Sequence, residues 1–231
     1  MVRRKSGVRT GVEEPGALAR LEGEAEAQAS EIYQENHELL KIYVDKLTST
    51  GIARGLLGPR ESSRIWSRHI LNCAALCEVL PQGTDVIDVG SGAGLPGIVV
   101  AIARPDLRIT LLEPMLRRWR FLGETVDQLG LTDRVTVSRG RAEDCSTTYE
   151  VVTARAVARL TKLLGWTTPL FHPNGRLLAL KGDSVQEEIA EAADLLEASG
   201  LIAEVMHVRA HPKAEATNVV KVTRARTGQP G

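Results

Sequence analysis

From about residue 81 onward, short apolar runs alternate with segments whose apolar residues have helical spacing. Short apolar runs predict strands at Asp85–Val89, Arg108–Leu112, Val135–Ser138, Val151–Ala154, Arg176–Lys181, Ile202–Val208 and Asn218–Thr223. Helical spacing lies between most of them, as in Leu116–Leu129, which Gly130 closes. Alternating strands and helices indicate an α/β fold with a mostly parallel sheet, and the last two strands, which no helix separates, predict an antiparallel hairpin.

The first 80 residues follow a helical pattern instead. Apolar residues from Glu24 to Leu47 recur at helical spacing, and Thr48–Gly51 is expected to end that helix. A short basic stretch follows, and a second amphipathic helix runs to about Leu80. We therefore expect a disordered tail over 1–17, a helical extension over 18–80, the α/β domain over 81–226, and a second disordered tail over 227–231.

Composition narrows the class of protein. The net charge is zero, yet residues 104–141 carry eight Arg against five acidic residues, so a basic face is compatible with the neutral total. Aromatic residues make up 3%, which argues against a base-stacking platform. The three cysteines are typical of a reducing cytoplasm. His69, Cys73 and Cys77 share a helical face but lack a fourth ligand, so we expect no metal. Without an apolar run long enough for a span or signal peptide, we expect no membrane contact.

A glycine-rich turn directly follows the first predicted strand. Residues 87–97 read IDVGSGAGLPG, in which two motifs overlap. Gly92-x-Gly94-x-x-Gly97 fits a dinucleotide site, and Asp88-x-Gly90-x-Gly92-x-Gly94 fits a site for S-adenosylmethionine. The second is favoured because Asp88 at the strand end would repel a pyrophosphate, whereas a sulfonium cofactor with an amino group tolerates that charge. Asp88, Gly90 and Gly92 are thus candidate cofactor-binding residues.

Other candidates stand at the ends of the following strands. Glu113 is placed to accept hydrogen bonds from ribose hydroxyls, and backbone groups of Ala142 and Glu143 are placed to pair with adenine. Arg155 ends the fourth strand, where it would hold the cofactor carboxylate or approach the target base. A surface acid at Glu113 and a structural ion pair at Arg155 remain alternatives. The Asn/Asp-Pro-Pro-aromatic motif of amine methylation is missing here, which favours a ring nitrogen, whose lone pair needs only positioning.

Several segments together resemble one bacterial family. These are Trp66-x-Arg68-His69-Ile70, the stretch DVGSGAGLPGI over 88–98, Ala142-Glu143-Asp144, Ala154-Arg155-Ala156 and Ala179-Leu180-Lys181-Gly182. Over residues 30–225 the chain is similar to the small-subunit rRNA guanine-N7 methyltransferases, also called the glucose-inhibited division protein B family. The resemblance implies a Rossmann-like class I S-adenosylmethionine-dependent methyltransferase with a seven-stranded, mostly parallel sheet behind N-terminal helices. It also implies methyl transfer to N7 of guanine 527 in 16S rRNA.

The resemblance implies roles for individual residues. Cofactor contacts fall on Gly90, Leu95, Ala142, Glu143 and Arg155, and Glu113 stands at an acidic position of the family. Arg155 and His69 are candidates for a catalytic role by positioning. Arg68, Arg139 and Lys181 are candidates for RNA binding. The chain departs from the family at Asn72-Cys73, Ala154 and Thr217-Asn218, so the roles of those side chains are open.

Two other functions compete with this interpretation. A small-molecule methyltransferase would show an apolar lid and no basic rim at its pocket. A nicotinamide-dependent oxidoreductase would need a hydride-transfer acid such as Tyr-x-x-x-Lys, which the sequence lacks. We expect a cytoplasmic monomer that acts on 16S rRNA or on the assembled small ribosomal subunit.

Overall fold

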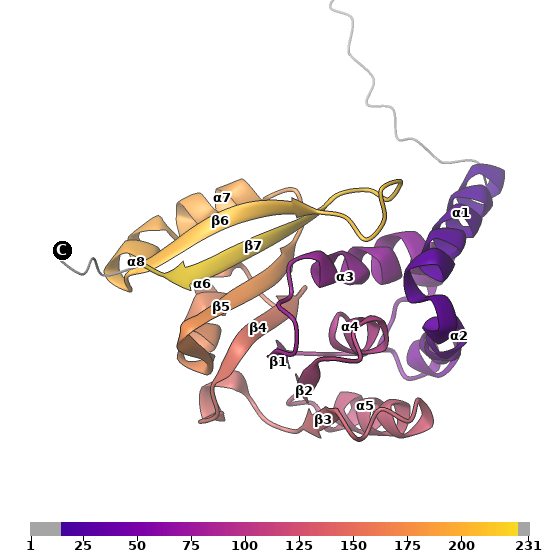
Figure 1. The fold of residues 1–231 in the computed structure, drawn as a ribbon, viewed down its shortest axis with the longest axis horizontal. Coiled ribbons are helices and arrows are strands. Elements are labelled where there is room, and N and C mark those ends of the chain that lie inside the picture. Colours follow the sequence, from indigo (N-terminus) through magenta and orange to yellow (C-terminus); the bar gives the residue numbers. More distant parts are fainter. Residues whose placement is uncertain (1–14, 226–231) are drawn as a thin grey trace, which may run out of the picture.

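The computed structural model describes residues 15–225, and its centre is a seven-stranded sheet (Figure 1). The strands are β1 (Asp85–Val89), β2 (Arg108–Leu112), β3 (Val135–Ser138), β4 (Tyr149–Arg155), β5 (Phe171–Lys181), β6 (Leu201–Val208) and β7 (Thr217–Arg224). Their order is β3-β2-β1-β4-β5-β7-β6; β1 to β5 are parallel, and β7 is antiparallel to β5 and β6. The predicted α/β class, mostly parallel sheet and final hairpin are confirmed.

The order of the strands creates a place for a ligand. The chain leaves β1 for β2 and β3 on one side and then returns to place β4 on the other side of β1. In a parallel sheet, such a reversal leaves a crevice beyond the carboxyl ends of the strands on either side of it. The glycine turn after β1 therefore lies at that crevice.

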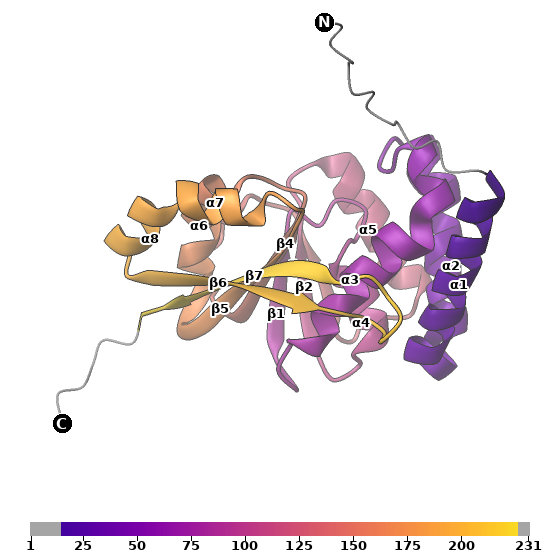
Figure 2. The same cartoon turned by 90° about the horizontal axis from the view of Figure 1, so that it is seen from above.

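Helices cover both faces of the sheet, and the cores that they bury are separate. The helices are α1 (Pro15–Tyr33), α2 (His37–Lys46), α3 (Asn72–Ala74), α4 (Gly97–Ala103), α5 (Leu116–Gln128), α6 (Leu160–Thr167), α7 (Val185–Glu191) and α8 (Ala193–Ala198). Elements α1 to α5 share one core with one face of the sheet, and α6 to α8 form the other core with the opposite face. Figure 2 shows α6, α7 and α8 grouped on one side of β5–β7, with α1 and α2 at the far end of the molecule.

The N-terminal helices differ from the predicted pattern. The single helix expected over 24–47 is two helices, because a 3₁₀ turn, η1 (Gln34–Asn36), interrupts it where Gln34 adopts φ +46°. The helix also does not end at Thr48–Gly51, which form a π-helical turn, η2 (Leu47–Gly51). The hydroxyls of Thr48 and Ser49 bond to carbonyls of the preceding turn, at Val44 and Asp45, so they are satisfied within the helix and do not have to end it.

The second predicted helix is a chain of short helical pieces. These are η3 (Pro59–Arg64), the π-helical η4 (Ile65–Leu71), α3, and η5 (Ala75–Glu78). Helix α1 begins at Pro15, so residues 15–17, expected as part of the tail, are helical. Residues 1–14 and 226–231 lie outside the described part of the chain. Within residues 15–225, the helices lack the combination of length and apolar character that crossing a membrane requires.

Candidate functional site

The turn after β1 is built from backbone bonds and left-handed glycines. Gly90, Gly92 and Gly94 all have positive φ, which side chains disfavour. The amides of Gly90 and Ser91 donate to the carbonyl of Leu112 at the end of β2, at 2.8 and 3.2 Å. A methyl group on Gly90 would lie 3.0 Å from Val157 Cγ2, so the glycine keeps a narrow space open between the two segments.

Asp88 supports this turn from behind. Its side chain is fully buried, and Oδ2 accepts the amide of Gly97 at 3.0 Å, while Oδ1 has no partner among the described residues. Burial raises the pKa of the carboxyl to about 7, against the opposing effect of the Gly97 hydrogen bond. The sequence predicts that Asp88 binds the cofactor. In the structure the carboxyl is buried beneath the turn and holds the start of α4, and a contact with the cofactor stays a prediction.

Glu113 ties the turn to the end of β2. It is 1% exposed, and its two oxygens accept the amides of Gly92 and Met115, each at 2.9 Å. Arg118 Nη1 lies 4.0 Å from Oε2. The alternative of a solvated surface acid is therefore wrong. Each carboxylate oxygen has a further lone pair, so the predicted contact with ribose hydroxyls stays a prediction.

A narrow apolar cavity of about 120 Å³ opens beside the turn. Gly90, Ala142 and Glu143, which the sequence had singled out, line it together. Pro114, Val157 and Trp166 complete its walls, and sequence spacing gave no signal for these three. A small apolar cavity of this kind suits a flat heteroaromatic ring.

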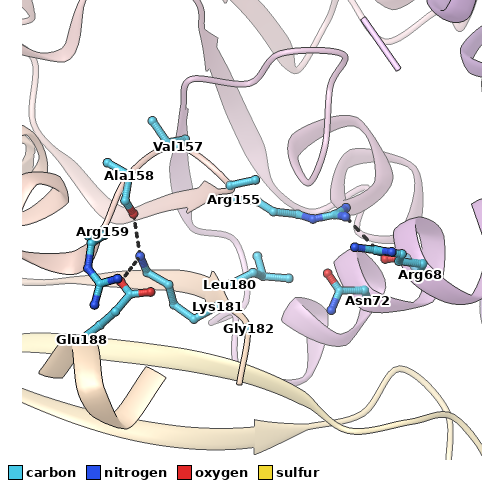
Figure 3. Close-up of a pocket in the computed structure, with 11 residues that line it drawn as sticks. Arg68, Asn72, Arg155, Val157, Ala158, Arg159, Leu180, Lys181, Gly182 and Glu188 are labelled. Atoms are coloured by element: carbon cyan, nitrogen blue, oxygen red, sulfur yellow. Dashed lines mark hydrogen bonds and ion pairs between the residues drawn. The ribbon is translucent and has the colours of Figure 1, made fainter. Parts of the chain in front are cut away.

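A second cavity of about 470 Å³ lies at the carboxyl ends of β4 and β5, facing η4 (Figure 3). Its lining is charged, with Arg68, Arg155, Arg159 and Lys181 against a single acid, Glu188. Val157 lines both cavities, so the two are neighbours. Leu95, expected at the cofactor, is half-buried in the turn and lines neither cavity.

Arg155 reaches across this second cavity to the helical extension. Its Nη1 donates to Cys73 Sγ at 2.9 Å, and its Nη2 lies 2.8 Å from His69 Nδ1 and 3.4 Å from the carbonyl oxygen of Arg68. In Figure 3 the guanidinium points away from Lys181 and toward Arg68. Bidentate hydrogen bonding of Arg155 to a cofactor carboxylate would therefore require at least one of these bonds to break.

His69 is enclosed by the same group of side chains. It is 8% exposed, with Nδ1 against Arg155 and Nε2 2.8 Å from Glu61 Oε2. Burial, reinforced by the charge of Arg155, lowers the pKa of the imidazole below its usual value. Because both ring nitrogens have protein partners, His69 does not face the cavity as a free base, and its candidacy for a role by positioning stays a prediction.

The three predicted RNA-binding residues are in different situations. Lys181 is 8% exposed at its side chain, and its ammonium bonds to Glu188 Oε2 and the carbonyl of Ala158, both at 2.7 Å, so the structure assigns it an internal role. Arg68 is 61% exposed at the cavity, 3.7 Å from Glu61. Arg139 is exposed just beyond β3, the edge strand, and lines neither cavity.

The residues that depart from the family pattern also meet in space. Asn72 Nδ2 donates to Thr217 Oγ1 at 3.0 Å, joining η4–α3 to the start of β7. Cys73 is buried against Arg155, and Ala154 is buried in β4. Two of the three departures thus form a neutral contact with each other.

The sheet order, the glycine turn and the paired cavities define a Rossmann-like class I S-adenosylmethionine-dependent methyltransferase. Solved structures agree with this fold. The mitomycin 7-O-methyltransferase MmcR has a TM-score of 0.58 at 18% identity, covering 93% of this chain and 74% of its own. TYW2 from P. horikoshii, solved with MeSAdo, has a TM-score of 0.53 at 12% identity, covering 67% and 61%.

Sequence comparison is more specific. The family described as rRNA small subunit methyltransferase G matches residues 36–217. The protein of that name from Thermobifida fusca is 50% identical over 198 residues, covering 84% of this chain and 83% of the relative. The one from Streptomyces avermitilis is 52% identical over 188 residues, covering 80% and 79%. The chain belongs to the rRNA small subunit methyltransferase G family.

Proposed function

We propose that this chain transfers the methyl group of S-adenosylmethionine to N7 of guanine 527 in 16S rRNA. The observation that carries the proposal is the family match over 36–217, reinforced by relatives of about equal length. The neighbouring cavities add a physical argument, since methyl transfer needs donor and acceptor side by side.

The apolar cavity fits the cofactor. Gly90 leaves room where a Cβ would contact Val157, and Ala142 and Glu143 present backbone groups for the adenine edge. Glu113 would take the ribose hydroxyls, and Leu95 would face the amino-acid portion. When bound, the cofactor supplies an electrophilic methyl group; the chain's own residues only orient the two reactants.

The acceptor would occupy the charged cavity. Guanine N7 has an in-plane lone pair and no proton, so its methylation needs no general base. The cavity fits this requirement, because its acid, Glu188, is bonded to Lys181 and His69 is enclosed. Both terminal nitrogens of Arg155 already donate hydrogen bonds within the protein. A single bond from Arg155 to guanine O6 therefore fits better than a bidentate contact with O6 and N7. A bidentate contact would block the nucleophile.

The charged lining also favours RNA over a small-molecule acceptor. Arg68 and Arg159 are well exposed at the cavity and suited to phosphates, and Arg139 would contact RNA farther out. The alternative, a small-molecule methyltransferase, would need an apolar cover over this site. We further propose that the enzyme works as a monomer in the cytoplasm, where ribosomes are assembled, since one chain supplies both cavities.

The test uses labelled S-adenosylmethionine with naked 16S rRNA and with small subunits from cells that lack this enzyme. We expect transfer to a single guanine, identified by digestion and mass spectrometry as N7-methylguanosine at position 527. The comparison of the two substrates shows which form is preferred, and a salt titration counts phosphate contacts. Absence of transfer to either substrate, with cofactor binding intact, would contradict the proposal.

A further inference from the structure

Three charged or polar side chains form a line from the helical extension to the end of β4. Glu61 lies in η3, His69 in η4 and Arg155 at the end of β4. Glu61 Oε2 is 2.8 Å from His69 Nε2, and His69 Nδ1 is 2.8 Å from Arg155 Nη2. The reaction proposed above uses Arg155 but assigns nothing to Glu61 or His69.

The chemistry of these groups determines where the protons lie. A guanidinium only donates, so Nδ1 of His69 must accept from Arg155, and the ring proton sits on Nε2. Nε2–H then donates to the carboxylate of Glu61, and this bond lowers the pKa of Glu61. Burial and the Arg155 charge lower the pKa of the imidazole, which favours the neutral ring. A protonated ring, or the other tautomer, would lose the bond to Arg155.

The other contacts of Arg155 are weak. Cys73 Sγ is a weak acceptor, and the carbonyl oxygen of Arg68 lies 3.4 Å from Nη2. Without His69, the guanidinium would lose its short bond to a nitrogen acceptor and would no longer be held firmly at the wall of the acceptor cavity.

We propose that Glu61 and His69 are positioning residues for Arg155: Glu61 selects the His69 tautomer, and that tautomer holds the guanidinium at the acceptor cavity. The inference rests on the proposed function, because it takes Arg155 to act on the acceptor. It predicts that the geometry of the acceptor side, and not the binding of the cofactor, depends on this line of residues.

Paired variants test each link separately. In His69→Asn the amide oxygen can take the place of Nδ1 and accept from Arg155, whereas the longer His69→Gln side chain places its amide near the former Nε2. Glu61→Gln keeps an acceptor for Nε2–H, and Glu61→Ala removes it. We expect kcat to fall about 10- to 100-fold in His69→Gln and Glu61→Ala, as for a misplaced catalytic group. His69→Asn and Glu61→Gln should stay within about 3-fold, with the KM for the cofactor nearly unchanged in all four.

A second readout does not depend on activity. With only five histidines in the chain, nitrogen-15 NMR of labelled histidine can assign the His69 signal by its loss in His69→Asn. We expect the Nε2–H tautomer in the wild type near pH 7.5 and a mixture in Glu61→Ala.

The outcomes separate this inference from the proposed function. If the wild type transfers no methyl group to 16S rRNA, the proposed function is contradicted. The His69 tautomer measured by NMR then tests the contacts among Glu61, His69 and Arg155 independently of activity. An active wild type with equal kcat in His69→Asn and His69→Gln overturns the inference. An Nδ1–H tautomer in the wild type overturns it as well.

Discussion

The two cavities of the site are built in opposite ways. The apolar one is built around the backbone of the Gly90 turn, at the ends of β1, β2 and β3, and its walls include the apolar side chains of Val157 and Trp166. The charged one is made of long side chains that come from η4, β4, β5 and α7. Polar groups hold both in shape: Asp88 and Glu113 secure backbone amides on one side, and ion pairs secure cationic side chains on the other.

This difference predicts which substitutions should disrupt the structure of each cavity most. A backbone-built cavity depends on steric fit, so added volume should damage it most. A cavity of long cations depends on their partners, so the loss of a buried partner should damage it most. Four variants sharpen or break this comparison, from the largest expected effect to the smallest.

Removal of the buried partner of Lys181 should have the largest effect. Glu188→Ala removes the carboxylate that pairs with the Lys181 ammonium, which then keeps the carbonyl of Ala158, and leaves the amide of Leu160 without its acceptor. We expect a loss of about 3–5 kcal/mol in the free energy of unfolding, measured with urea. Glu191→Ala is the matched control, since the Arg159–Glu191 pair is exposed and should contribute little. Equal losses in the two variants would mean that the charged wall does not depend on its buried pair.

The buried carboxyl under the glycine turn should make stability depend on pH. The pKa of Asp88 is raised from 3.8 to about 7, so the folded state holds the proton more tightly, and stability falls as pH rises through that window. Across about three units the full effect is about 4 kcal/mol. Asp88→Asn keeps an acceptor for the Gly97 amide and does not titrate. The free energy of unfolding of this variant, relative to that of the wild type, should therefore increase from pH 5 to pH 8.

Asp106 provides the control for this pH dependence. Its hydrogen bond from Arg104 holds its pKa below the usual value, so its titration is complete at lower pH. Asp106→Asn should therefore differ from the wild type by a constant amount between pH 5 and pH 8. An Asp88→Asn difference that is also constant over this range would show that the buried carboxyl is not held protonated.

Added volume under the turn comes next. A methyl group on Gly97 would lie 2.3 Å from Leu111 Cδ2 and 2.7 Å from Asp88 Oδ2. We expect Gly97→Ala to destabilise the fold by about 1–3 kcal/mol, read from thermal or urea unfolding. Gly123→Ala, in α5 with open space around it, should be neutral or stabilising by up to about 1 kcal/mol. A tolerated Gly97→Ala would show that the packing beneath the glycine turn is less tight than we argue.

The smallest effect is expected at the neutral contact between Asn72 and Thr217. Thr217→Val keeps the shape but removes the hydroxyl that accepts from Asn72, and should cost about 1 kcal/mol in urea unfolding. Adding Asn72→Leu should recover part of this loss, because both partners of the bond are then apolar. A loss as large as that of Glu188→Ala would place this contact among the main supports of the charged cavity.

Much of the sheet was predictable because buried parallel strands leave a strong local signal. The bounds of β1, β2 and β3 agree with the apolar runs, and Gly130 closes α5 with φ +64° as expected. The extension was less predictable, because η1, η2 and η4 depart from regular α-helical geometry. There, packing against neighbouring helices overrides the helical spacing of the sequence, as where η4 lies against α1.

Within the site, the sequence determined the apolar cavity around the glycine turn. The order of glycines after β1 and the residues at strand ends identified Gly90, Ala142 and Glu143, because the carboxyl ends of parallel strands meet at one edge. It could not determine side-chain direction. His69 and Arg155 are 86 positions apart, and they meet because the helical extension lies against the end of β4. Asp88 and Lys181 turn inward to the amide of Gly97 and to Glu188, and only the tertiary structure decided these contacts.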